Sequence, residues 1–205
     1  RPRYFQIRGL GELSQFSGEG APHFYIGHTM DHIDLSGLGI VGNLFDIQQI
    51  EVFKGPQSTT SGQNAMGGHI NISTLEPKNY TSINSEISIG NNNTALYNFY
   101  YTDKLNKNIS FSVSLSKFLT DGHITNKQLN NSFIQTLKDT NSKDESIIKL
   151  KLNYLKNSFI IKITTLFSNL NNKYDVWTPD NNGFITYSDY RGKDIQKINA
   201  ASIYV

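Results

Sequence analysis

Histidine and aspartate side chains between residues 28 and 46 are the groups of this 205-residue chain whose types and spacing could do chemistry. His28, Asp31, His32 and Asp34 lie close enough in sequence to suggest a metal site, and Asp31, Asp34 and Asp46 could act as paired carboxylates in acid–base catalysis. Metal ligands must also converge in space, and the chain shows no recognisable Ser-His-Asp or Glu-Glu spacing. We therefore interpret these side chains as turn, capping and surface groups, and predict no catalytic residue, no metal site and no cofactor.

Composition excludes several further classes of function. The chain has no Cys, which removes disulfide frameworks and cysteine-ligated metal sites. Its formal net charge of +2 is too small to indicate nucleic-acid binding. No apolar run reaches the length of a helical membrane span. The glycines at 55 and 62 are not followed by Lys-Ser/Thr, so the phosphate-binding loop of NTPases is absent as well.

The elements that would position any site begin with a run of short strands and glycine turns between residues 44 and 74. Apolar and β-branched residues predict strands at Ile50–Phe53 and at His69–Ser73. Gly55-Pro56 ends the first strand sharply, because Pro fixes φ and has no N–H to donate to a ladder. Gly67-Gly68 precedes the second strand and allows positive φ and close backbone approach. Such tight turns suit a compact domain that must fit inside a larger structure, but taken alone they favour a tight-turned β domain of any sort.

A different pattern follows residue 77, where glycines become rare and strict alternation appears. In Ile109–Ser116 the odd positions are apolar and the even positions are Ser, which predicts a strand with two unlike faces. A soluble sheet would turn the apolar face inward, whereas a transmembrane barrel would turn it toward lipid and the Ser face toward a wet lumen. Periodicity alone leaves both open. Related patterns predict five more strands, at Ile83–Gly90, Leu96–Thr102, Ile147–Tyr154, Phe159–Phe167 and Ile195–Val205.

Connections and side-chain types in this second region favour the barrel. Short polar links at 103–108 and near 156–157 alternate with long polar links at 120–144 and 168–194, as in outer-membrane barrels. Tyr97, Phe99 and Tyr101 share one face and could belong to an aromatic girdle. The lysines between Lys149 and Lys156 alternate with apolar residues, and we expect them to form a water-facing strand surface.

The order and spacing of the motif residues resemble the plug domain of TonB-dependent outer-membrane receptors. The similarity runs through Ile-Glu-Val, Gly-Pro, a small-residue loop, Gly-Gly and Ile-Asn-Ile, with an upstream Ile-Arg-Gly. His32 stands where the family usually has Gly in a turn, and Thr60-Ser61 and Gln63 also depart from the common pattern. The structural plug-motif residues are Arg8, Gly9, Ile50, Glu51, Val52, Gly55, Pro56, Gly62, Ala65, Gly67, Gly68, Ile70, Asn71 and Ile72.

The resemblance implies a mainly β fold, with a compact α/β plug portion followed by antiparallel strands of a transmembrane β-barrel. Residues 1–77 would be part of the plug, and residues 78–205 the first barrel strands. Plugged transporter barrels have about 22 strands, so we expect the barrel to be incomplete in this chain and the chain to be a fragment.

The resemblance also implies a function. A receptor of this family takes up a scarce ligand, such as a ferric siderophore or a cobalamin-like compound, by energy-coupled transport through the plugged barrel, and it is not an enzyme. The implied partners are a TonB-type energy-transducing complex of the inner membrane, outer-membrane lipid and a small ligand such as a metal chelate, with no nucleic acid. The implied location is the outer membrane of a Gram-negative bacterium. The alternative from the residues alone is a soluble or surface β-rich binding or adhesion protein that uses its Asn-rich loops.

Overall fold

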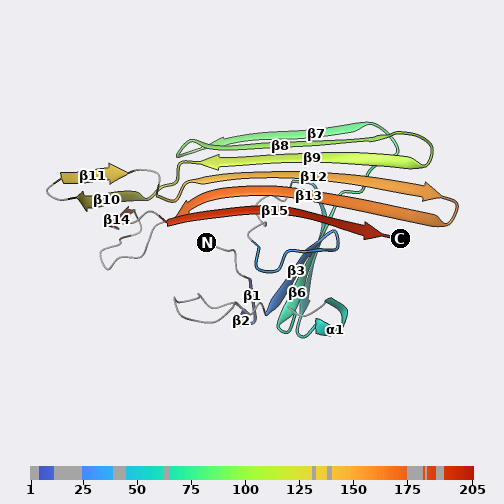
Figure 1. The fold of residues 1–205 in the computed structure, drawn as a ribbon, viewed down its shortest axis with the longest axis horizontal. Helices are drawn as coiled ribbons and strands as arrows, with labels where there is room; N and C mark the ends of the chain where they lie inside the picture. Colours follow the sequence, from blue (N-terminus) through green and yellow to red (C-terminus); the bar gives the residue numbers. More distant parts are fainter. Residues whose placement is uncertain are drawn as a thin grey trace.

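Strands make up nearly all of the regular structure of the chain (Figure 1). The computed structural model describes residues 5–11, 25–38, 45–61, 65–130, 133–137, 140–174, 182, 184–187 and 192–205. Within these ranges the one helix is a single turn, α1 (Ser58–Ser61). No helix in the described part of the chain is long and apolar enough to cross a membrane.

A long sheet is built by successive antiparallel hairpins in the order β15-β13-β12-β9-β8-β7. It contains each of the six strands predicted after residue 77. The strands are β7 (Ser82–Gly90), β8 (Thr94–Lys104), β9 (Ile109–Thr120), β12 (Lys143–Lys156), β13 (Phe159–Tyr174) and β15 (Gly192–Tyr204). The sheet is open, with β7 and β15 at its edges, so the predicted fold class of an incomplete antiparallel barrel is confirmed.

The two faces of the long sheet differ in chemistry, as the alternation predicts. The register pairs Val113 with Leu150 and Leu152 with Ile163, which places these apolar residues on one face. On the same face Leu115 and Phe167 are 39% and 43% exposed. The opposite face carries Ser112 paired with Lys151, and both are buried. We refer to these as the outer face and the inner face.

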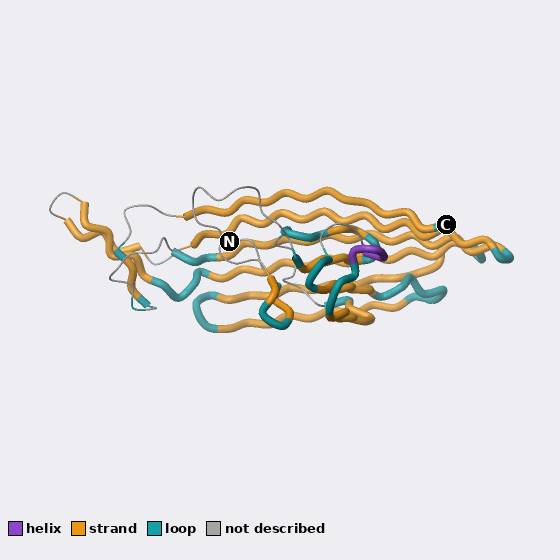
Figure 2. Tube along the Cα trace, turned by 90° about the horizontal axis from the view of Figure 1, so that it is seen from below, coloured by secondary structure: helices purple, strands orange, loops and turns teal. Residues whose placement is uncertain are grey.

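A smaller four-stranded sheet lies on the inner-face side of the long sheet and runs steeply away from it, so that one end of the smaller sheet meets the inner face (Figure 1; seen from below in Figure 2). Its order is β4-β3-β6-β5, with β3 and β6 parallel and the other pairs antiparallel. A two-stranded hairpin, β1–β2, precedes it. The strands are β1 (Gln6–Ile7), β2 (Leu10–Gly11), β3 (Ile26–Met30), β4 (Ile33–Asp34), β5 (Ile47–Lys54) and β6 (Gly68–Thr74).

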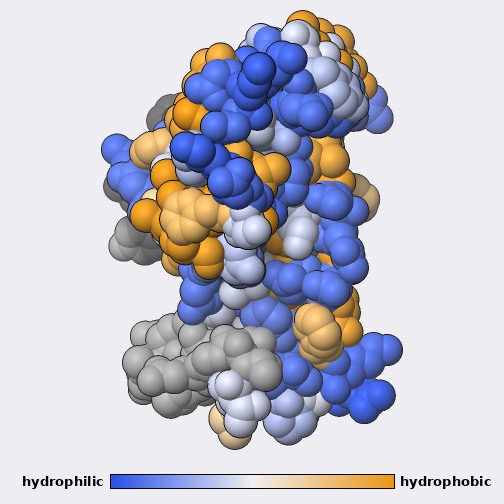
Figure 3. Space-filling view, turned by 90° about the vertical axis from the view of Figure 1, so that its right-hand side faces the viewer, coloured by the Kyte–Doolittle hydropathy of each residue, from blue (hydrophilic) through white to orange (hydrophobic). Residues whose placement is uncertain are grey.

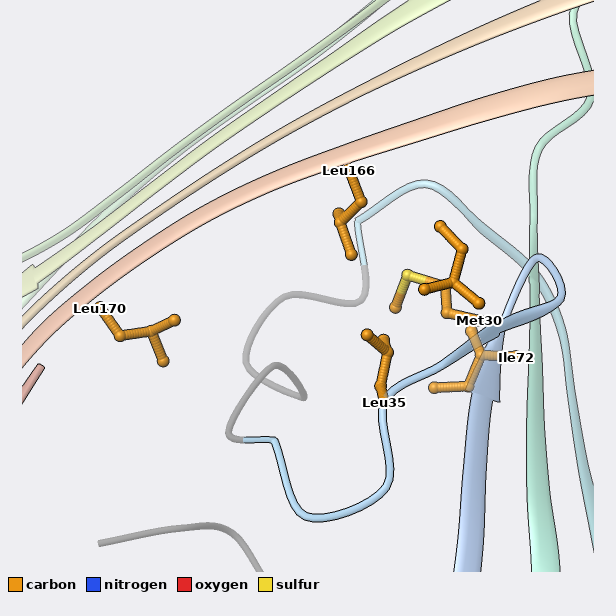
Figure 4. Packing of buried hydrophobic residues seen from close by; sticks show 6 residues of the cluster. Met30, Leu35, Ile72, Leu166 and Leu170 are labelled. Carbon is orange, nitrogen blue, oxygen red and sulfur yellow. The ribbon is translucent and has the colours of Figure 1, made fainter. Parts of the chain in front are cut away.

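The hydrophobic core lies between the two sheets. Figure 4 shows Met30 and Ile72 of the smaller sheet, and Leu35 just after β4, facing Leu166 on β13, with Leu170 further along the same strand. Ile33 completes the buried cluster. Each fully buried side chain of this size stabilises the fold by roughly 1.5–3 kcal/mol, so the cluster fixes the smaller sheet against the long one.

A third sheet extends beyond the long-loop end, where the sequence predicted only polar links. It consists of β10 (Thr125–Asn130), β11 (Phe133–Leu137) and β14 (Ile185–Thr186). The prediction missed this sheet because the β10 sequence, TNKQLN, is almost wholly polar and has no apolar alternation. Backbone pairing between β10 and β11 forms the hairpin although β10 has no apolar alternation.

Candidate functional site

Buried ion pairs join the inner face of β12 to the smaller sheet. Lys149 Nζ lies 2.9 Å from Asp46 Oδ1 and 2.8 Å from Asp46 Oδ2, and the two side chains are 7% and 6% exposed. The expectation that the lysines of this strand face water is therefore wrong for Lys149 and for Lys151. Alternation does place both on the polar face, but the smaller sheet covers that face and replaces water with carboxylates.

Lys151 is the centre of the second group of contacts. Its Nζ lies 3.1 Å from Asp31 Oδ1 and 3.3 Å from Glu76 Oε1, and it donates to the backbone oxygen of Thr74 at 3.2 Å. An ammonium group has three donors, so these contacts account for all of them. Lys151 therefore binds three points of the N-terminal region at once.

The turn between β3 and β4 presents Asp31 to this lysine. Asp31 and His32 both have positive φ, 47° and 65°, as in the tight two-residue turns that join antiparallel strands. His32 therefore adopts the positive φ that the usual Gly would supply. The Asp31 carboxylate accepts hydrogen bonds from Thr74 N at 2.9 Å and Thr74 Oγ1 at 2.6 Å. Ser202 on β15 donates to the Asp31 carbonyl oxygen at 2.7 Å, which ties the same turn to a second strand of the long sheet.

Glu76, in the link between β6 and β7, extends the cluster to β13. Asn153 Nδ2 donates to Glu76 Oε2 at 2.8 Å, and Lys162 Nζ lies 3.1 Å from the same oxygen. A polar cavity of about 260 Å³ opens beside these groups. At its rim the ring of His32 stacks on Tyr204, with the centroids 5.8 Å apart.

The charges of this cluster set the ionisation of its carboxylates. Burial alone would raise the pKa of Asp31, but the Lys151 charge, the two Thr74 hydrogen bonds and the charge of Lys149 together lower it below its ordinary value. Burial also acts to raise the pKa of Glu76, and the hydrogen bond from Asn153 with the charges of Lys151 and Lys162 lowers it overall. Both groups are ionised at neutral pH, so opposite charges hold the two sheets together. We call these ion pairs the clamp; its residues are Lys149, Lys151, Lys162, Asp31, Asp46 and Glu76.

Two histidines lie inside the smaller sheet, away from the clamp. His28 is almost fully buried beside the Phe5 ring, and burial lowers its pKa to about 4. His69 Nε2 lies 2.9 Å from Thr29 Oγ1, which itself donates to Asn71 Oδ1 at 3.0 Å. Because the hydroxyl proton goes to Asn71, the imidazole is the donor in the first bond and carries its proton on Nε2.

The four residues considered as metal ligands have different contacts, although the charge of Asp34 acts on His28. His28 is in the interior of the smaller sheet, Asp31 binds Lys151, and His32 contacts Tyr204. Asp34 Oδ1 accepts the backbone N–H of Ser36 at 2.9 Å, as a turn residue does. Among the described residues no three His, Asp or Glu side chains are grouped so that they could hold a metal ion.

The plug-motif glycines that the structure describes lie where a side chain would not fit or where φ is positive. Gly55 has a φ of 100°, and its N–H donates to Gly67 O at 3.2 Å. A Cβ on Gly68, whose φ is 156°, would approach Phe53 O to 2.6 Å and Ile7 Cδ1 to 2.7 Å. A Cβ on Gly67 would meet the side chains of Ile26 and Leu10 at 3.0 and 3.1 Å.

The other motif residues serve the same small fold. Arg8 and Gly9, with φ of 52° and 79°, form the turn between β1 and β2. Glu51 on β5 lies opposite Asn71 on β6 and accepts a hydrogen bond from its Nδ2 at 2.9 Å. The structural role assigned to the motif remains a prediction. Of its other members, Ala65 and Ile72 are buried, Ile70 is half-buried, Ile50, Val52 and Pro56 are exposed, and Gly62 lies outside the described residues.

Comparison with curated proteins finds two kinds of receptor. The chain is 35% identical over 66 residues to the catecholate siderophore receptor Fiu of Escherichia coli (strain K12), which covers 30% of this chain and 9% of that receptor. It is 29% identical over 92 residues to the vitamin B12 transporter BtuB of Vibrio vulnificus (strain YJ016), covering 45% of this chain and 15% of that protein. The matches therefore span a small part of each relative's length. No family profile matches the chain.

Solved structures share the fold at greater coverage. The ferric yersiniabactin uptake receptor FyuA from Yersinia pestis matches with a TM-score of 0.70 and 19% identity, over 97% of this chain and 31% of that one. The ferric-catecholate import receptor Fiu from E. coli K12 matches with a TM-score of 0.55 and 19% identity, over 75% of this chain and 21% of that one. The fold of the chain is thus that of one part of a larger receptor.

Proposed function

We propose that this chain is the plug-bearing part of a TonB-dependent outer-membrane receptor, the family whose motif it carries and whose fold it shares. The complete receptor takes up a scarce small ligand through a plugged β-barrel, driven by an inner-membrane partner of the TonB type. In this proposal residues 1–77 belong to the plug and residues 78–205 to the barrel wall. The chain acts by binding and moving a ligand, so it is not an enzyme.

The observation that carries the proposal is the docking of the motif-bearing sheet onto the polar inner face of the long sheet. Lys149 and Lys151 project from the wall into carboxylates of the smaller sheet, and Leu166 and Leu170 pack beside them. This is the arrangement that a plug inside a barrel requires: a wall that is polar on the inside and binds a compact domain there.

The outer face supports a membrane location over a soluble binding or adhesion protein. Phe99, Leu115 and Leu150 lie in the middle of the sheet and are nevertheless exposed. A soluble sheet turns such a face into its core, whereas an outer-membrane barrel turns it toward lipid. In Figure 3, a view onto the short-turn end, hydrophobic surface lies exposed along the margins of a largely hydrophilic end.

The clamp suggests how the plug could respond to an energy-transducing partner. Besides the apolar core cluster, the N-terminal region contacts the long sheet through polar groups, mainly at Lys149, Lys151 and Glu76. Ionic contacts can be exchanged for water without exposing much apolar surface, so a pull on the plug would meet resistance at a few defined points. The relatives named for siderophores and for vitamin B12 support a metal chelate as the ligand class.

Uptake by the complete receptor tests this function. Cells that lack other iron receptors should gain energy-dependent uptake of a ferric siderophore or a cobalamin when they express it, and the protein should sediment with the outer membrane. Dissipating the proton-motive force should abolish uptake and leave ligand binding intact. A receptor found in the soluble fraction, or uptake that persists without energy, would contradict the proposal.

A further inference from the structure

An apolar groove of about 400 Å³ lies on the outer face of the long sheet, opposite the clamp. Its lining includes Leu105, Phe111, Val113, Leu150, Leu152 and Ile163. These residues come from β9, β12 and β13 and from the short turn after β8. The three strands have a neighbour on both sides within this structure, so the groove does not arise from the free edges of the sheet.

The groove runs toward the short-turn end. Leu105, in the turn after β8, is 64% exposed and lies at that end, while Val113 and Leu150 lie further along the sheet. Tyr101 on β8 contacts the Phe111 ring, with centroids 5.7 Å apart, and forms a side of the same apolar surface. This apolar surface follows the strands as far as the turn at Leu105, and a hydrocarbon chain lying along it would be in apolar contact over its length.

Two lysines lie at the short-turn end of the sheet, toward which the groove extends through Leu105. Lys107 lies in the same turn as Leu105, and Lys156 ends β12 on the outer face. The two turns are adjacent, because Leu155 N donates to Asn108 O at 2.8 Å. Both lysines are exposed, and neither makes an ion pair with another residue in the described part of the chain. Asp103 is the acidic residue nearby, and its carboxylate accepts hydrogen bonds from Thr81 and Tyr101.

We infer that this groove is a binding site for an anionic glycerophospholipid of the bilayer leaflet at the short-turn end. One acyl chain would lie in the groove between β9 and β13, and the phosphate would be held by Lys107 and Lys156. Apolar contact secures the chain and positive charge selects the headgroup. The inference rests on the proposed membrane location, since only then does the groove meet lipid. In outer-membrane barrels short turns are periplasmic, which assigns the site to the inner leaflet.

Photo-crosslinking in lipid nanodiscs tests the site. The complete receptor is placed in nanodiscs of phosphatidylcholine containing a trace of phosphatidylglycerol with a photoactivatable acyl chain, and in a parallel set the same label is carried by phosphatidylcholine. Labelled peptides are then mapped by mass spectrometry. We expect the phosphatidylglycerol probe to label the groove residues preferentially, and the preference to fall roughly tenfold in K107A/K156A.

The matched control removes two lysines at the other end of the outer face. Lys193 and Lys197 on β15 are exposed near the long-loop end, and K193A/K197A should leave the preference at the groove unchanged. A groove-filling change, Val113→Phe, should lower labelling by both probes there and spare residues around Phe99.

The outcomes separate this inference from the proposed function. Equal labelling of the groove by the two probes, or an equal loss of preference in both lysine double variants, would overturn the phospholipid site. Labelling of the outer face by both acyl probes would in that case still support its contact with the membrane. If neither probe labels any part of the outer face, both the membrane location and the site are wrong.

Discussion

Variants of the Lys149–Asp46 pair measure how much a buried ion pair stabilises the docking of the smaller sheet on the long sheet. Removing one partner leaves the other charge buried without compensation, so Asp46→Ala should destabilise the docked smaller sheet by about 3–5 kcal/mol. The double variant Lys149→Met/Asp46→Leu should recover most of that loss, because an apolar pair of similar size carries no desolvation penalty. Urea titration of the complete receptor, with brief proteolysis to report release of the N-terminal sheet, measures both.

An exposed pair on the outer face provides the control for this cycle. Lys117 and Asp144 are 38% and 47% exposed, and Lys117→Met should cost less than about 1 kcal/mol. If Asp46→Ala behaves like Lys117→Met, the clamp is not a stabilising contact.

Acidification should loosen the smaller sheet in the range set by His28. The pKa of His28 is lowered from 6.5 to about 4 in the folded chain, chiefly by burial, so below pH 6.5 the unfolded chain takes up a proton that the folded chain does not. Stability should therefore fall as the pH drops from about 6.5 to about 4. The pKa of His69 is lowered in the same direction, and the lowered pKa values of Asp31 and Glu76 add a loss at more acidic pH.

Two histidine variants isolate this effect by the same urea assay. His28→Gln should flatten the change between pH 6.5 and 4, whereas His123→Gln, at an exposed position, should keep it. An unchanged pH profile in His28→Gln would show that the buried imidazole does not control it.

Gly68 should be needed for packing of the smaller sheet and not for ligand chemistry. Gly68→Val places a side chain against Phe53 O and Ile7 at positive φ, so the yield of protease-resistant receptor should drop. Gly90→Ala is the matched change, because the added Cβ meets only Thr94 at an ordinary 3.5 Å. A Gly68→Val receptor that folds normally and loses only ligand affinity would contradict the packing role.

The sequence predicted which residues lie in turns better than it predicted which residues form ion pairs. The sequence identifies Asp31 and Asp46 as turn residues, and both do lie in turns. Their lysine partners follow 120 and 103 residues later, so no local pattern could pair them. The signal that was available is the position of Lys149 and Lys151 on the Ser-bearing face of the sheet. Charged side chains on an inner wall require carboxylates opposite them once that wall is covered.

At the scale of the strand, β9 tests whether the outer face meets lipid. Val113→Arg should cost about 2–4 kcal/mol if that position is near the bilayer midplane. Spin labels at residues 111, 113 and 115 should collide readily with oxygen and poorly with a water-soluble nickel complex. Labels at Ser112 and Ser114, which are buried on the inner face, should be shielded from both. Greater nickel access at 113 and 115 would place this face in water.

Elements with a strong period were predictable and those without one were not. All six strands of the long sheet follow from alternation, and β5 and β6 follow from alternation with glycine turns. The β10–β11 hairpin was missed because β10, TNKQLN, is polar and β11, FIQTL, is short, so neither shows a regular alternation, and backbone hydrogen bonds pair them. The docking of one sheet on the other depends on long-range packing of Met30 and Ile72 with Leu166, which periodicity cannot specify.

At the scale of the whole molecule, this chain alone should not form a stable transmembrane barrel. The long sheet leaves β7 and β15 as edges, and each unpaired N–H or C=O group in lipid costs several kcal/mol. Expressed by itself and directed to the outer membrane, it should aggregate, whereas the complete receptor should insert. A fast-migrating, heat-sensitive band on a gel from this chain alone would contradict the large-barrel interpretation.

The clamp and the core cluster also bear on the order of assembly. Among the described residues, those of the long sheet that bind the smaller sheet through these contacts lie on β12, β13 or β15, in the part of the chain that follows the smaller sheet. In the proposed receptor these hairpins would therefore give the N-terminal sheet a docking surface as soon as they form. Strands made later would then assemble around a smaller sheet that is already docked. A misfolded smaller sheet would therefore disturb assembly of the barrel from its first hairpins onward.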